Sequence, residues 1–100
     1  MRKIVLLCQN GMSTSILARK MEKAAAEMGY SCVITAFPVL DIDNIIEQPD
    51  LILLGPQIRF QKKKLQSLYP QYKFAVIDMV AYGTMNGKKI IEQSKKVLGD

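Results

Sequence analysis

The sequence predicts an α/β fold: a three-layer sandwich in which helices cover both faces of a four-stranded parallel sheet. Four short apolar, β-prone segments recur along the 100 residues, and each is followed by a segment with helical signals. Residues 4–7 and 51–54 are apolar at every position, which indicates strands buried on both faces. Because 49% of the residues are hydrophobic, the chain has enough apolar side chains to form one packed core. Residues 1–100 are therefore expected to form a single domain.

The first strand is predicted at residues 3–7 and the first helix at about residues 14–28. The helix is indicated by five apolar residues spaced along one face, namely Leu17, Met21, Ala24, Ala25 and Met28. Gly29 is well placed to end this helix, because glycine readily adopts the left-handed conformation found just after helices.

The second strand is predicted at residues 31–36, and the element after it is the least regular. Asp41 can cap a short helical piece there, and Pro49 prevents its continuation. The apolar face of this piece would consist of Ile42, Ile45 and Ile46.

The third strand is predicted at residues 50–54, followed by a helical stripe that ends before Pro70 and consists of Ile58, Leu65, Leu68 and Tyr69. Residues 61–64 would lie on the outside of this helix. After a fourth strand at residues 73–77, Asn86 is a candidate cap for a last helix, in which Lys95 and Lys96 would complement the negative end. The apolar face of that helix would consist of Ile90, Ile91, Ser94, Val97 and Leu98.

Three loops of this fold are expected at one edge of the sheet. Right-handed crossovers bring the segments that begin at Cys8, Gly55 and Asp78 to the carboxyl ends of the strands. Ligands of such sheets bind at this edge, at the point where the strand order reverses. The functional site is therefore predicted there.

Composition excludes several kinds of chemistry within this chain. It contains no histidine, so Ser-His-Asp and Cys-His catalysis, histidine-bound metals and phosphohistidine are all excluded. No metal and no cofactor is expected. The net charge of +5 comes without interleaved aromatic residues, which argues against nucleic-acid binding. No apolar run approaches the roughly 18 residues needed to cross a bilayer, and the amino terminus lacks the apolar core of a signal peptide.

The two cysteines are predicted to differ in role. Without a secretory signal, Cys8 and Cys32 indicate a reducing cytosol rather than a disulfide framework. Cys32 is expected mid-strand as an inert core residue. Cys8 instead ends a strand and opens a polar loop before a helix, where backbone N–H groups and the helix dipole favour a thiolate and can hold a phosphate. From this pattern alone, a packed strand-end cysteine is an equally open interpretation.

The loop after Cys8 has the composition of an anion cradle. Gly11 allows the backbone to approach an anion closely, while Asn10 can support the turn through its side chain. The hydroxyl groups of Ser13, Thr14 and Ser15 add hydrogen-bond donors. A tetrahedral phosphoryl group attached to the sulfur would fit such a cup.

The run Cys8-Gln9-Asn10-Gly11-Met12-Ser13-Thr14-Ser15 resembles the phosphorylation loop of the IIB components of bacterial phosphotransferase sugar-uptake systems. The lactose/cellobiose/chitobiose class is the most similar. Two later segments, at residues 53–58 and 76–83, also look like that family, so the resemblance spans nearly the whole chain. It implies the fold of the low-molecular-weight tyrosine phosphatases, and a relay in which Cys8 is the phosphocysteine and residues 9–15 are its cradle.

The resemblance also implies the partners. In that family a histidine of the IIA component donates the phosphoryl group, and the cysteine passes it to a β-linked sugar held by the membrane-embedded IIC component. The missing histidine then belongs to the donor. The chain is accordingly expected in the cytoplasm, associated with the inner face of the membrane through IIC and without inserting into it.

The strongest alternative is a low-molecular-weight cysteine phosphatase or an arsenate reductase, whose loop has a similar shape. The phosphatase signature places an arginine six residues after the cysteine, where it would hold the phosphate oxygens, but this chain has Thr14. The arsenate reductase would need further functional cysteines. A third interpretation, a phosphate-responsive receiver, lacks the acidic cluster required at the end of the first strand.

Five residues on the same sheet edge are candidates for the neighbouring wall of the site: Gly55, Pro56, Gln57, Asp78 and Tyr82. Each has a structural alternative. Residues 55–57 are also consistent with a simple strand-to-helix turn, Tyr82 with core packing, and Asp78 with a strand-end residue that caps the next turn rather than a water-activating carboxylate. Arg59 and the run Lys62, Lys63 and Lys64 are either a partner surface or a solvated helix face.

Overall fold

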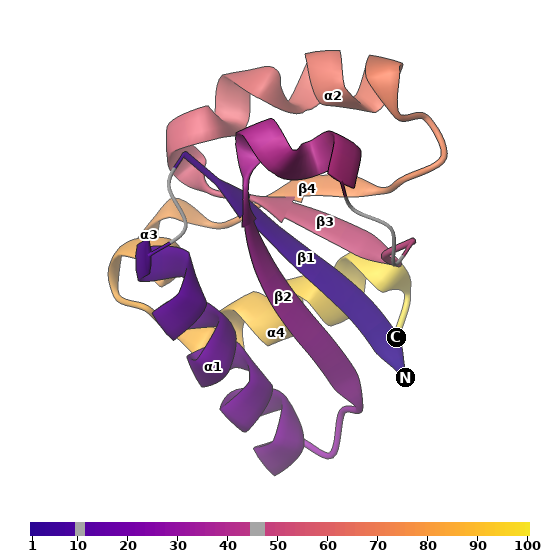
Figure 1. Cartoon of the computed structure of the whole chain (residues 1–100). Coiled ribbons are helices and arrows are strands. Elements are labelled where there is room, and N and C mark those ends of the chain that lie inside the picture. Colours follow the sequence, from indigo (N-terminus) through magenta and orange to yellow (C-terminus); the bar gives the residue numbers. More distant parts are fainter. Residues whose placement is uncertain (10–11, 45–47) are drawn as a thin grey trace.

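The computed structural model describes residues 1–9, 12–44 and 48–100, with the side chains of residues 12–14 left aside (Figure 1). Its strands are β1 (Arg2–Cys8), β2 (Cys32–Pro38), β3 (Leu51–Leu54) and β4 (Phe74–Val76). Its α-helices are α1 (Met12–Glu27), α2 (Lys62–Leu68), α3 (Met79–Gly83) and α4 (Gly87–Leu98), and its 3₁₀ helices are η1 (Val39–Asn44) and η2 (Pro56–Gln61). None of the helices in the described ranges is long and apolar enough to span a bilayer.

The four strands form one parallel sheet in the order β2-β1-β3-β4. Leu7 pairs with Phe37 on one side and with Leu54 on the other, and Leu54 pairs in turn with Val76. The carboxyl ends of all four strands therefore lie at one edge, as predicted. The chain moves from β1 to β2 on one side and later returns to β3 on the other, so the strand order reverses at β1.

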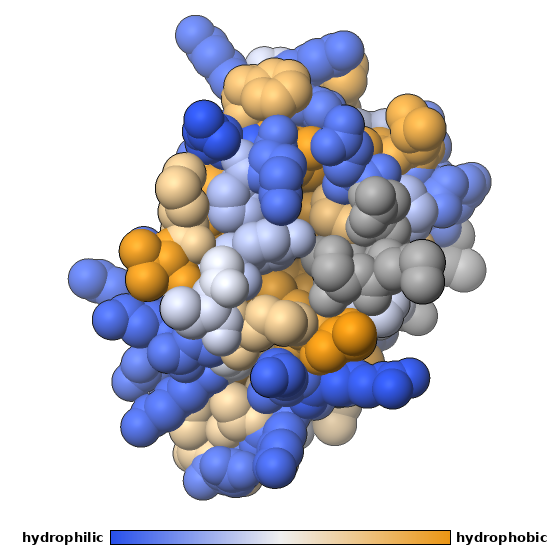
Figure 2. Space-filling view, turned by 90° about the vertical axis from the view of Figure 1, so that its left-hand side faces the viewer, coloured by the Kyte–Doolittle hydropathy of each residue, from blue (hydrophilic) through white to orange (hydrophobic). Residues whose placement is uncertain are grey.

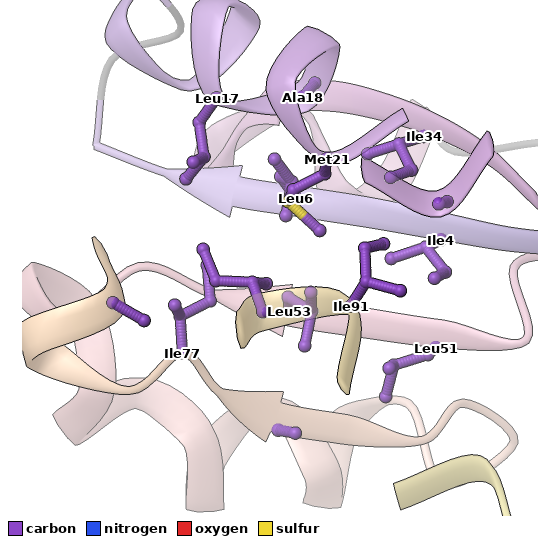
Figure 3. Packing of buried hydrophobic residues seen from close by; sticks show 14 residues of the cluster. Ile4, Leu6, Leu17, Ala18, Met21, Ile34, Leu51, Leu53, Ile77 and Ile91 are labelled. Atoms are coloured by element: carbon purple, nitrogen blue, oxygen red, sulfur yellow. The ribbon is translucent and has the colours of Figure 1, made fainter. Parts of the chain in front are cut away.

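Helices α1, α3 and α4 cover one face of the sheet (Figure 1). Figure 3 shows Leu17, Ala18 and Met21 of α1 lying over Leu6 of β1, with Ile91 of α4 close to Leu53. All six of these side chains are buried. Gly29 has a φ of 70° and ends the turn after α1, as its position predicts.

The opposite face is covered by η1, η2 and α2, which contribute Ile42, Ile58 and Leu65. These pack on the alternate residues of the central strands, namely Val5, Leu7, Ile52 and Leu54. Burial on both faces explains why β1 and β3 are continuously apolar, and it confirms the predicted three-layer α/β sandwich.

Three details differ from the sequence prediction. Asp41 lies inside η1 rather than at its cap, because the helix already begins at Val39; Ile45 and Ile46 lie outside the described residues. The predicted third helix is divided into η2 and α2, and Leu68, the last residue of α2, is 59% exposed instead of joining the stripe. Helix α3 was not predicted.

The caps of α4 follow the prediction. The Asn86 side chain accepts a hydrogen bond from the Lys89 backbone N–H at 3.1 Å, and Lys95 and Lys96 lie in the last turn. Gly99 adopts a left-handed φ of 78° after the helix. These features stabilise both ends of the longest helix on the carboxyl half of the chain.

Asp100 joins the two ends of the described chain. The Arg2 guanidinium donates two hydrogen bonds to its carboxylate, at 2.9 and 2.8 Å, and the Tyr30 hydroxyl donates a third at 2.5 Å. These hydrogen bonds, that from Arg2 foremost, lower the pKa of Asp100 to about 2. Burial first, and then the hydrogen bond to Asp100, raise the pKa of Tyr30 to about 12.

We expect the Asp100 cluster to make stability fall in acid. The unfolded chain binds a proton at Asp100 near pH 3.8 and the folded chain only near pH 2, so the contribution is complete above about pH 4 and is lost between about pH 4 and pH 2. Asp100→Asn should flatten this part of the stability profile, measured as the urea midpoint at successive pH values. An unchanged slope in the variant would contradict the assignment.

Candidate functional site

Cys8 is the last residue of β1 and lies where the strand order reverses. The residue is 3% exposed. Its register partner on β2 is Pro38, and on the other side the Gly55 N–H donates to the Leu7 carbonyl oxygen at 2.9 Å. The sulfur-bearing residue is thus held between the ends of two neighbouring strands.

Helix α1 begins four residues after Cys8 and has no acidic residue in its first turn. The first N–H groups of a helix lack intrahelical partners, and here no carboxylate offsets the positive end of the dipole. The structure places Gln9 as an exposed residue directly after the strand and Ser15 as an exposed residue of the first turn. Asn10 and Gly11 lie outside the described residues, and Met12, Ser13 and Thr14 are placed by their backbone only, so the predicted cup stays a prediction.

The wall beside Cys8 is built around Gly55. A Cβ atom at Gly55 would lie 3.0 Å from Gln57 Oε1, 3.6 Å from the Leu7 carbonyl oxygen and 3.7 Å from Tyr82 Cε1. Gln57, from η2, and Tyr82, from α3, therefore converge at Gly55, whose backbone N–H is hydrogen-bonded to the residue before Cys8. Pro56 is buried behind them, whereas Gln57 is exposed.

Asp78 is the cap of α3. Its Oδ2 accepts a hydrogen bond from the Ala81 N–H at 3.0 Å, which is the geometry of an N-cap. Of the two interpretations from sequence, the cap is the one that the structure shows. By fixing the start of α3, Asp78 also fixes Tyr82 four residues later.

Gln93 of α4 is a supporting residue that sequence reasoning missed. Its Nε2 donates to the Val76 carbonyl oxygen at 2.8 Å, and its Oε1 accepts from the Asp78 N–H at 3.1 Å. The side-chain amide thereby pairs with the end of β4 in place of a further strand. The available signal was a polar residue on the inward side of α4, three residues after Ile90 and four before Val97.

Cys32 lies far from this edge. It pairs with Arg2 at the amino end of the β1–β2 ladder, six register steps from Cys8 and therefore about 20 Å away. Both cysteines carry thiols. Burial, and then the Glu22 carboxylate, raise the pKa of the Cys32 thiol, which disfavours its reactive form. Cys32 begins β2 and is half-buried, so the expected mid-strand core position is corrected.

The arrangement suits binding and transfer of a small anion at sulfur. A thiol lies at the reversal point of a parallel sheet, and a helix N-terminus follows it. In the described part of the chain, no group of three or more cysteine and acidic residues is placed to hold a metal ion.

Comparison with known proteins gives one consistent family. Residues 3–93 match the family model for the lactose/cellobiose-specific IIB subunit of the phosphotransferase system. The chain is 40% identical over 100 residues to the oligo-β-mannoside-specific EIIB component of Bacillus subtilis, covering 98% of this chain and 97% of the relative. It is 38% identical over 102 residues to the cellobiose-specific EIIB component of Lactococcus lactis, covering 95% and 94%.

Solved structures agree with the sequence comparison. The solution structure of a cellobiose-specific IIB component from Borrelia burgdorferi has a TM-score of 0.77 at 33% identity, with 98% of this chain and 92% of the other covered. The lactose-specific IIB domain from Streptococcus pneumoniae has a TM-score of 0.82 at 16% identity, with 95% of both chains covered, and shows the shared fold.

Proposed function

Because this chain belongs to the lactose/cellobiose-specific IIB subunits of the phosphotransferase system, we propose that it relays a phosphoryl group through Cys8. The donor in this proposal is a phosphohistidine of a IIA component. The acceptor is a β-linked sugar, such as cellobiose, chitobiose or lactose, held by a membrane IIC component. The 100 residues act as one IIB domain at the cytoplasmic face of the membrane.

The observation that carries the proposal is the position of Cys8 at the reversal point of the sheet, directly before the N-terminus of α1. Amide groups at such a helix end stabilise the negative charge of a phosphoryl group. The related IIB components named above share this chain's length and fold, and the absence of histidine leaves the donor group to another protein.

Two displacements at phosphorus make up the relay. In the first, the Cys8 thiolate attacks the phosphorus of the phosphohistidine; an S–P bond forms, the P–N bond breaks, and its electron pair returns to the imidazole. In the second, a sugar hydroxyl attacks the same phosphorus; an O–P bond forms, the S–P bond breaks, and the thiolate is restored as the hydroxyl loses its proton. The protein contributes position and charge stabilisation to both steps.

The composition of the loop favours storage of phosphate over hydrolysis. A cysteine phosphatase stabilises its transition states with an arginine that grips the phosphoryl oxygens, and position 14 of this chain is threonine. Asp78, a carboxylate at this edge of the sheet, accepts a hydrogen bond as the cap of α3. Because of both features, we expect the phosphocysteine to be hydrolysed slowly and to persist until a sugar accepts the phosphoryl group.

A transfer experiment tests the function. The chain is incubated with labelled phospho-IIA and then with membranes that contain a matching IIC and a β-linked disaccharide. We expect label to pass to the chain and then to the sugar, and we expect no steady turnover of an aryl phosphate by the chain alone. Steady aryl phosphatase activity, with no transfer to sugar, would favour the phosphatase alternative.

We expect Gly55→Ala to slow phosphoryl acceptance by roughly tenfold, because the added methyl group displaces Gln57 and contacts Tyr82 beside Cys8. The clash at 3.0 Å is with the end of a flexible side chain, so the thermal midpoint should stay within about 5 °C. Gly83→Ala is the matched control, since a Cβ there meets nothing within 4 Å. Equal initial labelling rates for the two variants would remove Gly55 from the site.

A further inference from the structure

The net charge of this chain is concentrated in one segment of the sequence. Residues 51–77, which include β3, η2, α2 and β4, contain Arg59, Lys62, Lys63, Lys64 and Lys73 and no acidic residue. The other 73 residues hold nine basic and nine acidic residues, so the whole excess of +5 lies in this segment. Among the described residues the ion pairs involve Arg2 alone, and the lysines of α2 take part in none.

The outer side of η2 and α2 also exposes apolar side chains. Phe60 is 76% exposed and Leu68 is 59% exposed, whereas Ile58 and Leu65 of the same segment face the core. In Figure 2, hydrophilic side chains crowd the top of the molecule, where η2 and α2 lie in Figure 1, with apolar atoms among them. An aromatic residue between arginine and lysine side chains is typical of a helix that contacts a membrane interface.

A groove of about 460 Å³ on this side supplies hydrogen-bond donors for an anion. It is lined by Arg59, Phe60, Lys62, Lys63, Gln66 and Ser67, none of which is acidic. Arg59 is held in place by a hydrogen bond of 2.8 Å from its guanidinium to the Pro56 carbonyl oxygen. Guanidinium and ammonium donors beside an aromatic ring match the phosphate of a lipid headgroup that borders on acyl chains.

We propose that the outer side of η2 and α2 is a contact surface for anionic lipid headgroups. A bilayer is favoured over an acidic protein because the three consecutive lysines point about 100° apart around the helix and so fan over a broad area. Lysine side chains spread in this way can each contact a different mobile lipid headgroup, whereas they cannot all reach one fixed carboxylate of a protein. This proposal rests on the proposed function in one respect: the sugar that accepts the phosphoryl group is held by a membrane protein.

The contact would set the direction in which Cys8 faces. Helix η2 begins at the carboxyl edge of the sheet, two residues after β3 ends beside β1, and α2 runs back from there across the layer. With this layer on the bilayer, the Cys8 edge would face along the membrane plane (Figure 1). A donor in solution and an acceptor at the membrane surface could then reach it in turn.

Vesicle flotation of the full chain tests the lipid contact. Vesicles of phosphatidylcholine with phosphatidylglycerol should bind the chain, pure phosphatidylcholine vesicles should not, and binding should decline steeply with salt. We expect the triple variant Lys62→Gln, Lys63→Gln, Lys64→Gln to lose roughly a hundredfold in affinity for the anionic vesicles. Phe60→Ala should weaken binding further by removing the apolar contact.

The charge-matched control is Lys23→Gln, Lys88→Gln, Lys89→Gln, which alters exposed lysines of the opposite layer. Both triple variants lower the net charge from +5 to +2, so equal losses of binding would overturn the surface assignment. Absence of vesicle binding by the unmodified chain would also overturn the proposal. If no vesicle binding is seen but the Lys62–Lys64 variant is labelled more slowly by phospho-IIA, the surface contacts a protein partner and the proposal is likewise overturned. Labelling of Cys8 needs no vesicles, so failure of this proposal is distinguishable from failure of the relay.

Discussion

Cys8→Ser is expected to abolish phosphoryl relay, lowering the rate of transfer from IIA to sugar by at least roughly a thousandfold. A serine hydroxyl stays protonated near neutral pH and is a far weaker nucleophile than a thiolate. The substitution exchanges one side-chain atom, sulfur for the smaller oxygen, at a residue that is 3% exposed. The rate is measured with labelled phospho-IIA and sugar-loaded IIC membranes.

Cys32→Ser is the matched control for this result. The same atom is exchanged at the opposite end of the β1–β2 ladder, and its transfer rate should stay within about twofold of the unmodified chain. Thermal unfolding of both variants separates loss of the nucleophile from loss of the fold. Full activity of Cys8→Ser, or equal loss in the two variants, would contradict the role of Cys8.

Gly87→Ala is expected to destabilise the fold by about 1–3 kcal/mol, the usual range for overpacking. A Cβ atom at Gly87 would lie 2.6 Å from the Lys20 carbonyl oxygen, 2.7 Å from the Lys20 carbonyl carbon and 2.9 Å from the Met21 nitrogen. These are backbone atoms of α1, so α1 and α4 must separate to admit the methyl group. The thermal midpoint should fall by roughly 5–20 °C.

The direction of the stability change in Gly87→Ala distinguishes close packing of α1 and α4 from helix propensity. Alanine is the better helix former by up to about 1 kcal/mol, so propensity alone predicts that Gly87→Ala stabilises α4. Gly83→Ala, at an open position of α3, should show that gain or no change. A rise in the thermal midpoint of Gly87→Ala would show that α1 and α4 are not in close contact, and that the placement of α1 beside Cys8 is wrong.

The strands and the long helices could be predicted because each carries a strong local signal. β1 and β3 are apolar at successive positions, and α1 and α4 repeat apolar residues on one face with a glycine or asparagine at an end. Helix α3 was missed because it has five residues, of which Met79 and Val80 are 61% and 72% exposed, so it has no apolar stripe. Leu68 was misplaced because an apolar residue at the right spacing can still lie on the exposed side of a short helix.

Cys8 could be located from sequence because its signals are contiguous: a strand, a thiol, a glycine and then three hydroxyl residues in the first turn of a helix. The residues of the wall beside Cys8 could be predicted from the sequence, but their contacts with one another could not. Gln57 and Tyr82 meet at Gly55 only because β3 lies next to β1, and Gln93 supports Asp78 only because α4 packs at the end of β4. These neighbours depend on strand order, which no local pattern contains.

The most direct test of the central claim is intact-mass measurement of the chain after mixing with phosphorylated IIA, followed by peptide mapping under conditions that preserve thiophosphate esters. The relay predicts a mass increase of one phosphoryl group, located on the peptide that contains Cys8, and loss of that increase when IIC and sugar are added. A phosphoryl group on any other residue, or no increase with an active donor, would contradict it.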